Sequence, residues 1–99
     1  MDNLTQKIKA RFDHEAAKQV LREKYEAKLL FAHQGGMFRA DADLIVLLNS
    51  FDSEDIVILD EFQNPVKVNR QSLLKEAKQR HQEQLNAWSV ELAEQSRQR

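Results

Sequence analysis

The residues that could carry out acid–base or metal chemistry are spread thinly along this chain. Its three histidines, His14, His33 and His81, stand 19 and 48 residues apart, so no two of them form a metal-ligand motif. His14-Glu15 begins like the helix of a zinc protease, but Lys18 occupies the position where that helix needs a second histidine. The sequence therefore predicts no zinc site.

Acidic residues in the central segment are the other candidate metal ligands. The densest group, Asp52-Ser53-Glu54-Asp55, lacks the alternating spacing and the glycine of an EF-hand calcium loop. The remaining acidic residues of this segment are Asp41, Asp43, Asp60 and Glu61. Because carboxylates are common helix caps and turn residues, we expect these roles for them and no bound metal.

Nucleophilic and phosphate-binding chemistry also lacks the residues that it needs. The chain has no cysteine, which excludes thiolate catalysis and disulfides. Thr5, Ser50, Ser53 and Ser72 have no histidine nearby in a nucleophilic pattern, and Gly35-Gly36 lacks the Lys-Ser/Thr pair of a phosphate-binding loop. We therefore expect no enzymatic activity and no cofactor.

A C-terminal amphipathic helix over residues 70–97 is the most regular element that could position a site. Asn69 is its expected N-cap, and six residues recur at steps of three or four within a wedge of roughly 80°. They are Leu74, Ala77, His81, Leu85, Trp88 and Leu92. His81 has two open interpretations, a partly buried packing residue with one hydrogen bond or a pH switch.

A long N-terminal helix is expected over residues 3–33, with Asn3 as its N-cap and Gly35-Gly36 as its end. Its first apolar residues are spaced by fours, so they wind around the helix axis. They are Leu4, Ile8, Phe12, Ala16 and Val20. Because one straight partner cannot cover this row, residues 3–20 should bend, cross another helix or meet another chain. Residues 21–33 should pack in the core through Leu21, Tyr25, Leu29 and Ala32, with Leu30 and Phe31 pointing elsewhere.

Two smaller elements are expected between the long helices. Residues 41–49 form a short helix with Asp41 as its N-cap, although Leu-Ile-Val-Leu-Leu is also compatible with a strand. Residues 56–68 form one β-hairpin, with Gln63-Asn64-Pro65 as the turn signal. Since a two-stranded ribbon is marginal alone, its apolar residues should pack near Leu73 and Leu74 of the final helix.

The expected fold class is therefore α+β and mostly helical, with residues 1–99 in a single domain. Hydrophobic residues make up 41% of the 99 residues and charged residues 31%, a balance that suits long helices with one buried side each. Two glycines and one proline leave little room for the turns of an all-β fold. We see neither a signal-peptide pattern nor a membrane span, and expect a soluble, cytoplasmic protein.

Net charge is −1, but the basic residues gather toward the two ends of the chain. Residues 1–33 hold seven Lys or Arg against five acids, whereas residues 34–68 hold two against seven. The N-terminal basic residues are Lys7, Lys9, Arg11, Lys18, Arg22, Lys24 and Lys28. They spread around the helix and alternate with acids, so nucleic-acid binding is possible but is the alternative rather than the leading hypothesis.

Phe38 to Trp88 carries a resemblance to known proteins. It depends on FRADADLI from Phe38, on VILDEFQNPVKVNR from Val57, and on a following helix with Leu73-Leu74 and the region of Trp88. This half of the chain resembles a group of small uncharacterised proteins encoded by contractile-tailed bacteriophages, including cyanophages. The resemblance implies an accessory or assembly factor, expressed in the host cytoplasm, and implies no reaction.

The leading hypothesis is a non-enzymatic protein–protein interaction module. Its two long helices present more apolar residues than a short helix and one hairpin can cover, which is typical of helix-pair and helix-in-groove association. Partners would be another protein or a second copy in a homo-oligomer. The expected interface residues are Leu4, Ile8, Phe12, Leu85, Trp88 and Leu92, with Trp88 as the anchor. Packing of the same residues within one chain is the competing interpretation.

Overall fold

Three helices and two β-hairpins make up the chain in the computed structural model, which describes the backbone of residues 2–97 and the side chains of residues 4–97. The elements in order are α1 (Asp2–Lys28), β1 (Leu30–His33), β2 (Gly36–Arg39), α2 (Ala42–Asn49), β3 (Asp55–Leu59), β4 (Pro65–Asn69) and α3 (Arg70–Arg97). The mostly helical α+β class is confirmed.

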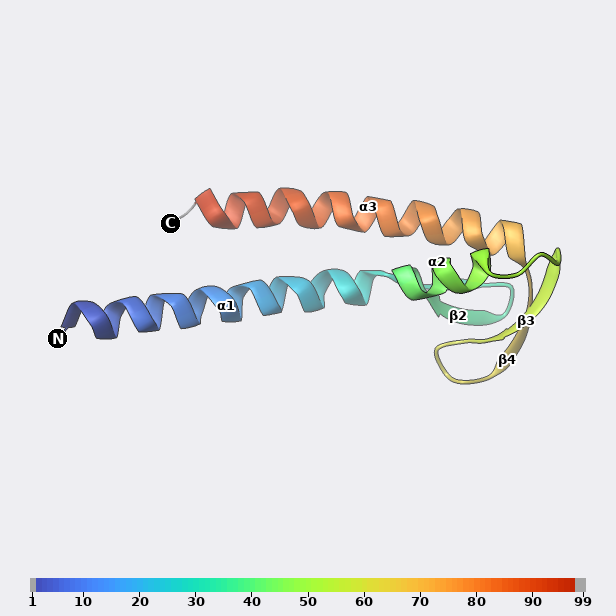
Figure 1. Ribbon diagram of the computed structural model, residues 1–99, viewed down its shortest axis with the longest axis horizontal. Coiled ribbons are helices and arrows are strands. Elements are labelled where there is room, and N and C mark those ends of the chain that lie inside the picture. The colour runs from blue at the N-terminus through green and yellow to red at the C-terminus, as the bar shows by residue number, and fades with distance from the viewer. Residues whose placement is uncertain (1, 98–99) are drawn as a thin grey trace.

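The two long helices lie side by side and run in opposite directions, with α2 and both hairpins gathered at one end (Figure 1). The molecule measures 63 × 24 × 21 Å and has a radius of gyration of 18.5 Å. A compact domain of this length has a radius of gyration of about 13 Å. The structure is elongated because the distal halves of α1 and α3 project away from the core.

The core lies where α3 begins and contacts both α2 and β4. The buried cluster consists of Phe31, Phe38, Ala40, Leu48, Ile56, Ile58, Val68, Leu73, Leu74 and Ala77. In β3, Ile56 and Ile58 point into this cluster, while Val57 and Leu59 face outward, as the two-residue period of a strand requires. The expected hairpin over residues 56–68, with its apolar side against Leu73 and Leu74, is confirmed.

Two of the three expected helix caps are present. The Asp41 side chain accepts a hydrogen bond from the Leu44 amide at 2.9 Å, so α2 is a helix and the strand alternative is wrong. Asn69 Oδ1 accepts one from the Ser72 amide at 2.9 Å and caps α3. The side chain of Asn3, the third expected cap, lies outside the described residues, and α1 already includes Asp2.

The prediction that the first helix continues to residue 33 is wrong, because α1 ends at Lys28 and Leu30–His33 forms β1. β1 pairs antiparallel with β2, through a turn in which Gln34 (φ 47°) and Gly35 (φ 86°) both have positive φ. Positive φ at both central residues is the mark of a type I′ hairpin turn, not of a helix end.

Burial explains why the strand forms in place of a last helical turn. Phe31, expected to point away from the core, is buried against Phe38 of β2, whereas Ala32 is exposed. At Gly36, an added Cβ would lie 2.8 Å from Cε2 of Phe38 and 3.1 Å from Cγ2 of Val66. Gly36 therefore allows the two hairpins to approach each other closely. This role differs from the expected one, which was to end a helix.

Asp60 ties the second hairpin to the first. Its carboxylate accepts hydrogen bonds from the amides of Asn64, Phe62 and Met37, at 3.0, 2.9 and 3.2 Å. The bond from Asn64, supported by those from Met37 and Phe62, holds the pKa of Asp60 below its ordinary value. Its role is that of a turn residue, as expected for the acidic residues of this segment.

Candidate protein interface

The most exposed apolar surface on α1 is the row spaced by fours, Leu4, Ile8, Phe12, Ala16 and Val20, called here the α1 row. Leu4 is 66% exposed, Ile8 61% and Phe12 76%, and Ala16 and Val20 are exposed as well. Within the described residues, α1 reaches beyond the last turn of α3 (Figure 1). The first three turns of α1 therefore project into solvent with their large apolar side chains uncovered.

A different face of α1 packs against α3. Leu21 and Tyr25 on this face are buried, and His14 and Ala17 are partly buried. Phe12 and Leu21 are nine residues apart, which is two and a half helical turns, so their side chains leave opposite sides of the helix. The helix thus uses one face within the chain and leaves the α1 row on the other.

Where α1 and α3 meet, Tyr25 stacks on Trp88 with ring centroids 6.1 Å apart and planes 5° from parallel. The Tyr25 hydroxyl and the Lys24 ammonium each donate a hydrogen bond of 2.8 Å to Oε1 of Glu91. The bond from Lys24, with that from Tyr25, lowers the pKa of Glu91. The same bonds raise the pKa values of Lys24 and Tyr25. This cluster sets the register of the two helices.

Beside the Tyr25–Trp88 stack lies an open groove of about 520 Å³ between α1 and α3. Its apolar lining comes from Tyr25, Leu29, Leu85 and Trp88. Arg22, Glu26, Arg39 and Asp41 supply charged groups at its edges. Arg22 pairs with Glu26 at 3.1 Å, and Arg39 donates to the backbone carbonyl of Glu26 at 3.0 Å, so these charges are already engaged with groups of the same chain.

The six expected interface residues fall into two groups. Leu4, Ile8 and Phe12 belong to the α1 row. Leu85 (39% exposed) and Trp88 line the groove, and Leu92 lines a neighbouring hollow together with Trp88. Trp88, the expected anchor, is partly buried and already has an intramolecular partner in Tyr25. The α1 row is therefore the larger uncovered apolar surface of the two.

His81 is partly buried and lies at the edge of the same groove. It is the polar member of the six α3 residues at helical spacing, called here the α3 stripe, which are Leu74, Ala77, His81, Leu85, Trp88 and Leu92. Its Nδ1 lies 2.9 Å from the backbone carbonyl oxygen of Ala40. A carbonyl oxygen can only accept, so Nδ1 is the nitrogen that carries the hydrogen. This geometry fits the packing interpretation of His81, a partly buried residue with one hydrogen bond.

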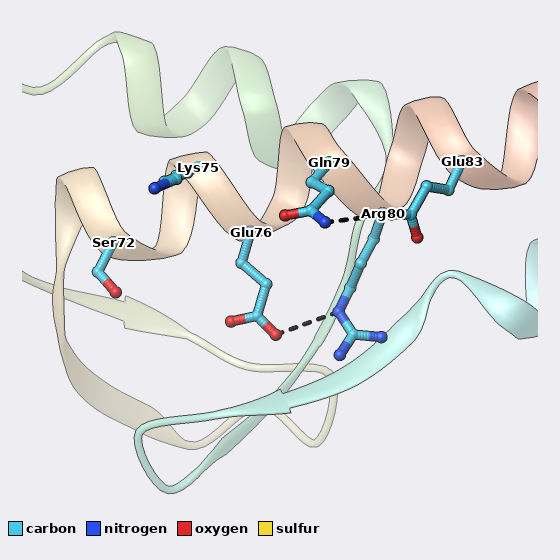
Figure 2. Close-up of a pocket in the computed structure, with 6 residues that line it drawn as sticks. All are labelled: Ser72, Lys75, Glu76, Gln79, Arg80 and Glu83. Carbon is cyan, nitrogen blue, oxygen red and sulfur yellow. Dashed lines mark hydrogen bonds and ion pairs between the residues drawn. The ribbon is translucent and has the colours of Figure 1, made fainter.

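A second hollow, of about 430 Å³, is lined by six polar residues of α3 (Figure 2). Glu76 and Arg80 point from α3 toward the strands below, and Glu76 accepts hydrogen bonds from His33 Nδ1 at 2.8 Å and Arg80 Nε at 3.1 Å. The bond from His33, with that from Arg80, lowers the pKa of Glu76. Arg80 also lies over the Phe31 ring, 5.0 Å from its centroid.

The His33–Glu76–Arg80 cluster holds β1 against α3. His33 and Glu76 are 43 residues apart, so no sequence spacing could have indicated this pair. All lining residues of the hollow come from a single helix, which leaves no opposite wall to enclose a substrate. Its geometry therefore supports a structural role.

The described residues contain neither a cluster of three or more candidate metal ligands nor a membrane-spanning helix. Among residues 4–97, no three histidine or acidic side chains are grouped so that they could hold an ion. No helix in the same part of the chain combines the length and apolar character needed to cross a bilayer.

No protein-family model, curated protein or solved structure gives a significant match to this chain.

Proposed function

We propose that this chain is a non-enzymatic protein–protein interaction module, an accessory or assembly protein of a bacteriophage that acts in the host cytoplasm through its helix surfaces. The observation that carries the proposal is the exposed α1 row on a helix that projects past α3. The phage context comes from the resemblance of residues 38–88.

Covering the α1 row would be favourable. Complete burial of a leucine, isoleucine or phenylalanine side chain contributes about 1.5–3 kcal/mol. Leu4, Ile8 and Phe12 follow one another at single-turn intervals, as do the anchor residues of helices that dock against a helix or a groove. A helical turn without tertiary contacts is also only marginally stable in water, so a bound partner would order the projecting end of α1.

The groove beside Trp88 offers a second contact on the same side of α1. Leu4 and Arg22 are 18 residues apart, as are Ile8 and Glu26, and 18 residues make five full turns. Leu4 and Ile8 therefore share a face of α1 with the two residues that border the groove. A protein that docks on the start of the α1 row can extend along this face to Leu85, Trp88 and Leu92.

Nucleic-acid binding through the basic residues of α1 has weaker support. Lys18 lies 3.8 Å from Glu15, Arg22 pairs with Glu26, and Lys24 pairs with Glu91 at 2.8 Å. Each of these cations is therefore partly neutralised before any phosphate approaches. If the chain is retained on DNA or RNA at low ionic strength and released by salt, this alternative gains over the proposed one.

Site-specific photocrosslinking in bacterial cells that express the full chain tests the proposal. Phe12 (76% exposed) and Phe62 (69% exposed) are matched positions, since both are exposed phenylalanines and only Phe12 lies in the α1 row. With p-benzoylphenylalanine at position 12, we expect a discrete protein adduct that is absent with the same group at position 62. Equal crosslinking at both positions, or none at position 12, would contradict the proposal.

A further inference from the structure

We propose that the α1 row is covered by α1 of a second copy of this chain, packed antiparallel about a two-fold axis that passes beside Phe12. This inference depends on the proposed function, because it names the partner of the same surface. Three features support it: the symmetry of the row, the charges beside it, and the free space around it.

The α1 row is symmetric about its central residue. Leu4 and Val20 lie eight residues before and after Phe12, and Ile8 and Ala16 lie four residues before and after it. In an antiparallel pair centred on Phe12, Ile8 of one copy faces the small Ala16 of the other, and Leu4 faces Val20. Such an isologous contact uses the same patch on both copies.

Charges beside the row favour the antiparallel direction. Lys9 and Arg11 precede Phe12, and Asp13 and Glu15 follow it. By helical geometry Lys9 and Asp13 lie on one side of the row, and Arg11 and Glu15 on the other. In an antiparallel pair with its two-fold axis at Phe12, Lys9 of one copy therefore comes near Asp13 of the other. On the opposite side of the contact, Arg11 comes near Glu15 in the same way.

Other arrangements would bring like charges together. In a parallel pair related by a two-fold axis, the two sides of the row exchange, so Lys9 of one copy would come near Arg11 of the other, and Asp13 near Glu15. An antiparallel pair centred on Ile8 would be bordered by Lys7, Lys9 and Arg11, all of them basic. Because like charges across an interface are unfavourable, the charge pattern favours an antiparallel pair centred on Phe12 over a parallel pair and over a pair centred on Ile8.

A second helix has room to bind. Phe12 leaves α1 on the side opposite to Leu21, which packs toward α3, so an approaching helix does not meet α3 of the same copy. A row spaced by fours forms the ridge that packs between the matching ridges of another helix, with an expected crossing angle of about −50°. The row winds around α1, so a helix aligned with the axis of α1 cannot cover it. A helix that crosses α1 at this angle follows the direction of the row.

The available area suits a dimer at the small end of the specific range. If Leu4, Ile8, Phe12 and Val20 each bury about 100 Å², two copies bury roughly 800 Å² of apolar surface. With the charged residues beside the row, the total reaches roughly 1,200 Å², the lower limit for a specific interface. We therefore expect a dimer that dissociates on dilution.

Sedimentation equilibrium of the full chain tests the inference with a matched pair of variants. Ile8 in the α1 row and Val90 on the outer side of α3 are both 61% exposed, so neither Ile8→Glu nor Val90→Glu should alter folding, which circular dichroism checks. We expect the unchanged chain and Val90→Glu to form dimers with dissociation constants within twofold of each other. Ile8→Glu should weaken the dimer at least tenfold.

Disulfide crosslinking tests the direction of the helices, because the chain has no cysteine of its own. A mixture of Ile8→Cys and Ala16→Cys chains should form the mixed disulfide more readily than either variant links to itself. Preferred linkage of position 8 to position 8 would overturn the antiparallel arrangement. A monomeric unchanged chain, or equal dimerisation of Ile8→Glu and Val90→Glu, would overturn the second copy as partner.

These failures remain distinct from failure of the proposed function. If the chain is monomeric but p-benzoylphenylalanine at position 12 links it to a different protein, the interaction module stands and only the second copy is wrong. If position 12 links to nothing and the chain is monomeric, both are wrong.

Discussion

Replacing Leu73 by alanine tests how the fold holds the projecting helices in place. Leu73 is fully buried at the start of α3, in the cluster that joins α2 and both hairpins. Leucine-to-alanine changes at such sites cost about 3–5 kcal/mol, through lost burial and the cavity that remains. A domain of this length has a total stability of about 5–15 kcal/mol, so Leu73→Ala should remove a large fraction of it.

Leu85→Ala is the matched control, since it makes the same substitution on the same helix at a position that is 39% exposed. We expect it to cost about 1 kcal/mol or less. Urea unfolding followed by circular dichroism measures both, and the slope with urea should be unchanged because both variants expose similar surface on unfolding. Leu73→Ala should also lower the melting temperature by at least about 12 °C. Equal unfolding midpoints for the two variants would refute the placement of the core.

Two further predictions concern the hairpins. Gly36→Ala should lower the free energy of unfolding in urea by about 1–3 kcal/mol, because the added Cβ would lie 2.8 Å from the Phe38 ring and 3.1 Å from Val66. An unchanged unfolding midpoint would contradict that close approach. Asp60 has a lowered pKa in the folded chain, so its contribution to stability is complete above its ordinary value of 3.8 and is lost as pH falls through the lower folded value. At neutral pH, Asp60→Asn should therefore have a lower melting temperature than the unchanged chain, and this difference should shrink in strong acid. A difference that is the same at every pH would show that the carboxylate charge does not contribute to stability.

Much of the fold could be predicted from local signals. Asp41 and Asn69 are caps whose side chains reach backbone amides three residues later, so α2 and α3 begin where the sequence indicates. The hairpin over residues 56–68 follows from alternation of apolar residues around one turn. These features depend on residues within a few positions of each other.

The end of α1 could not be predicted in this way. Tyr25, Leu29 and Ala32 keep a helical spacing, while Phe31 and His33 find partners only in the folded chain, at Phe38 and Glu76. Those contacts favour the strand Leu30–His33 over another helical turn. Gly35-Gly36 is compatible with a helix end and with a hairpin turn, and tertiary packing decides between them.

The candidate interface was predictable to a similar degree. The spacing by fours predicted that one straight partner could not cover the α1 row, and Leu4, Ile8 and Phe12 are exposed. The stack of Tyr25 on Trp88 was not predictable, because it depends on the register of two helices separated by both hairpins. Trp88 therefore has a larger role within the chain than its position on the α3 stripe suggested.

Amide hydrogen exchange of residues 4–20, measured as a function of protein concentration, shows most directly whether α1 is covered by α1 of a second copy. A projecting helix without tertiary contacts opens readily, whereas the same helix in a dimer interface is protected. We expect exchange around Phe12 to slow progressively as concentration rises, with no change around Leu73 in the core. Exchange around Phe12 that is fast and identical at every concentration would contradict the account.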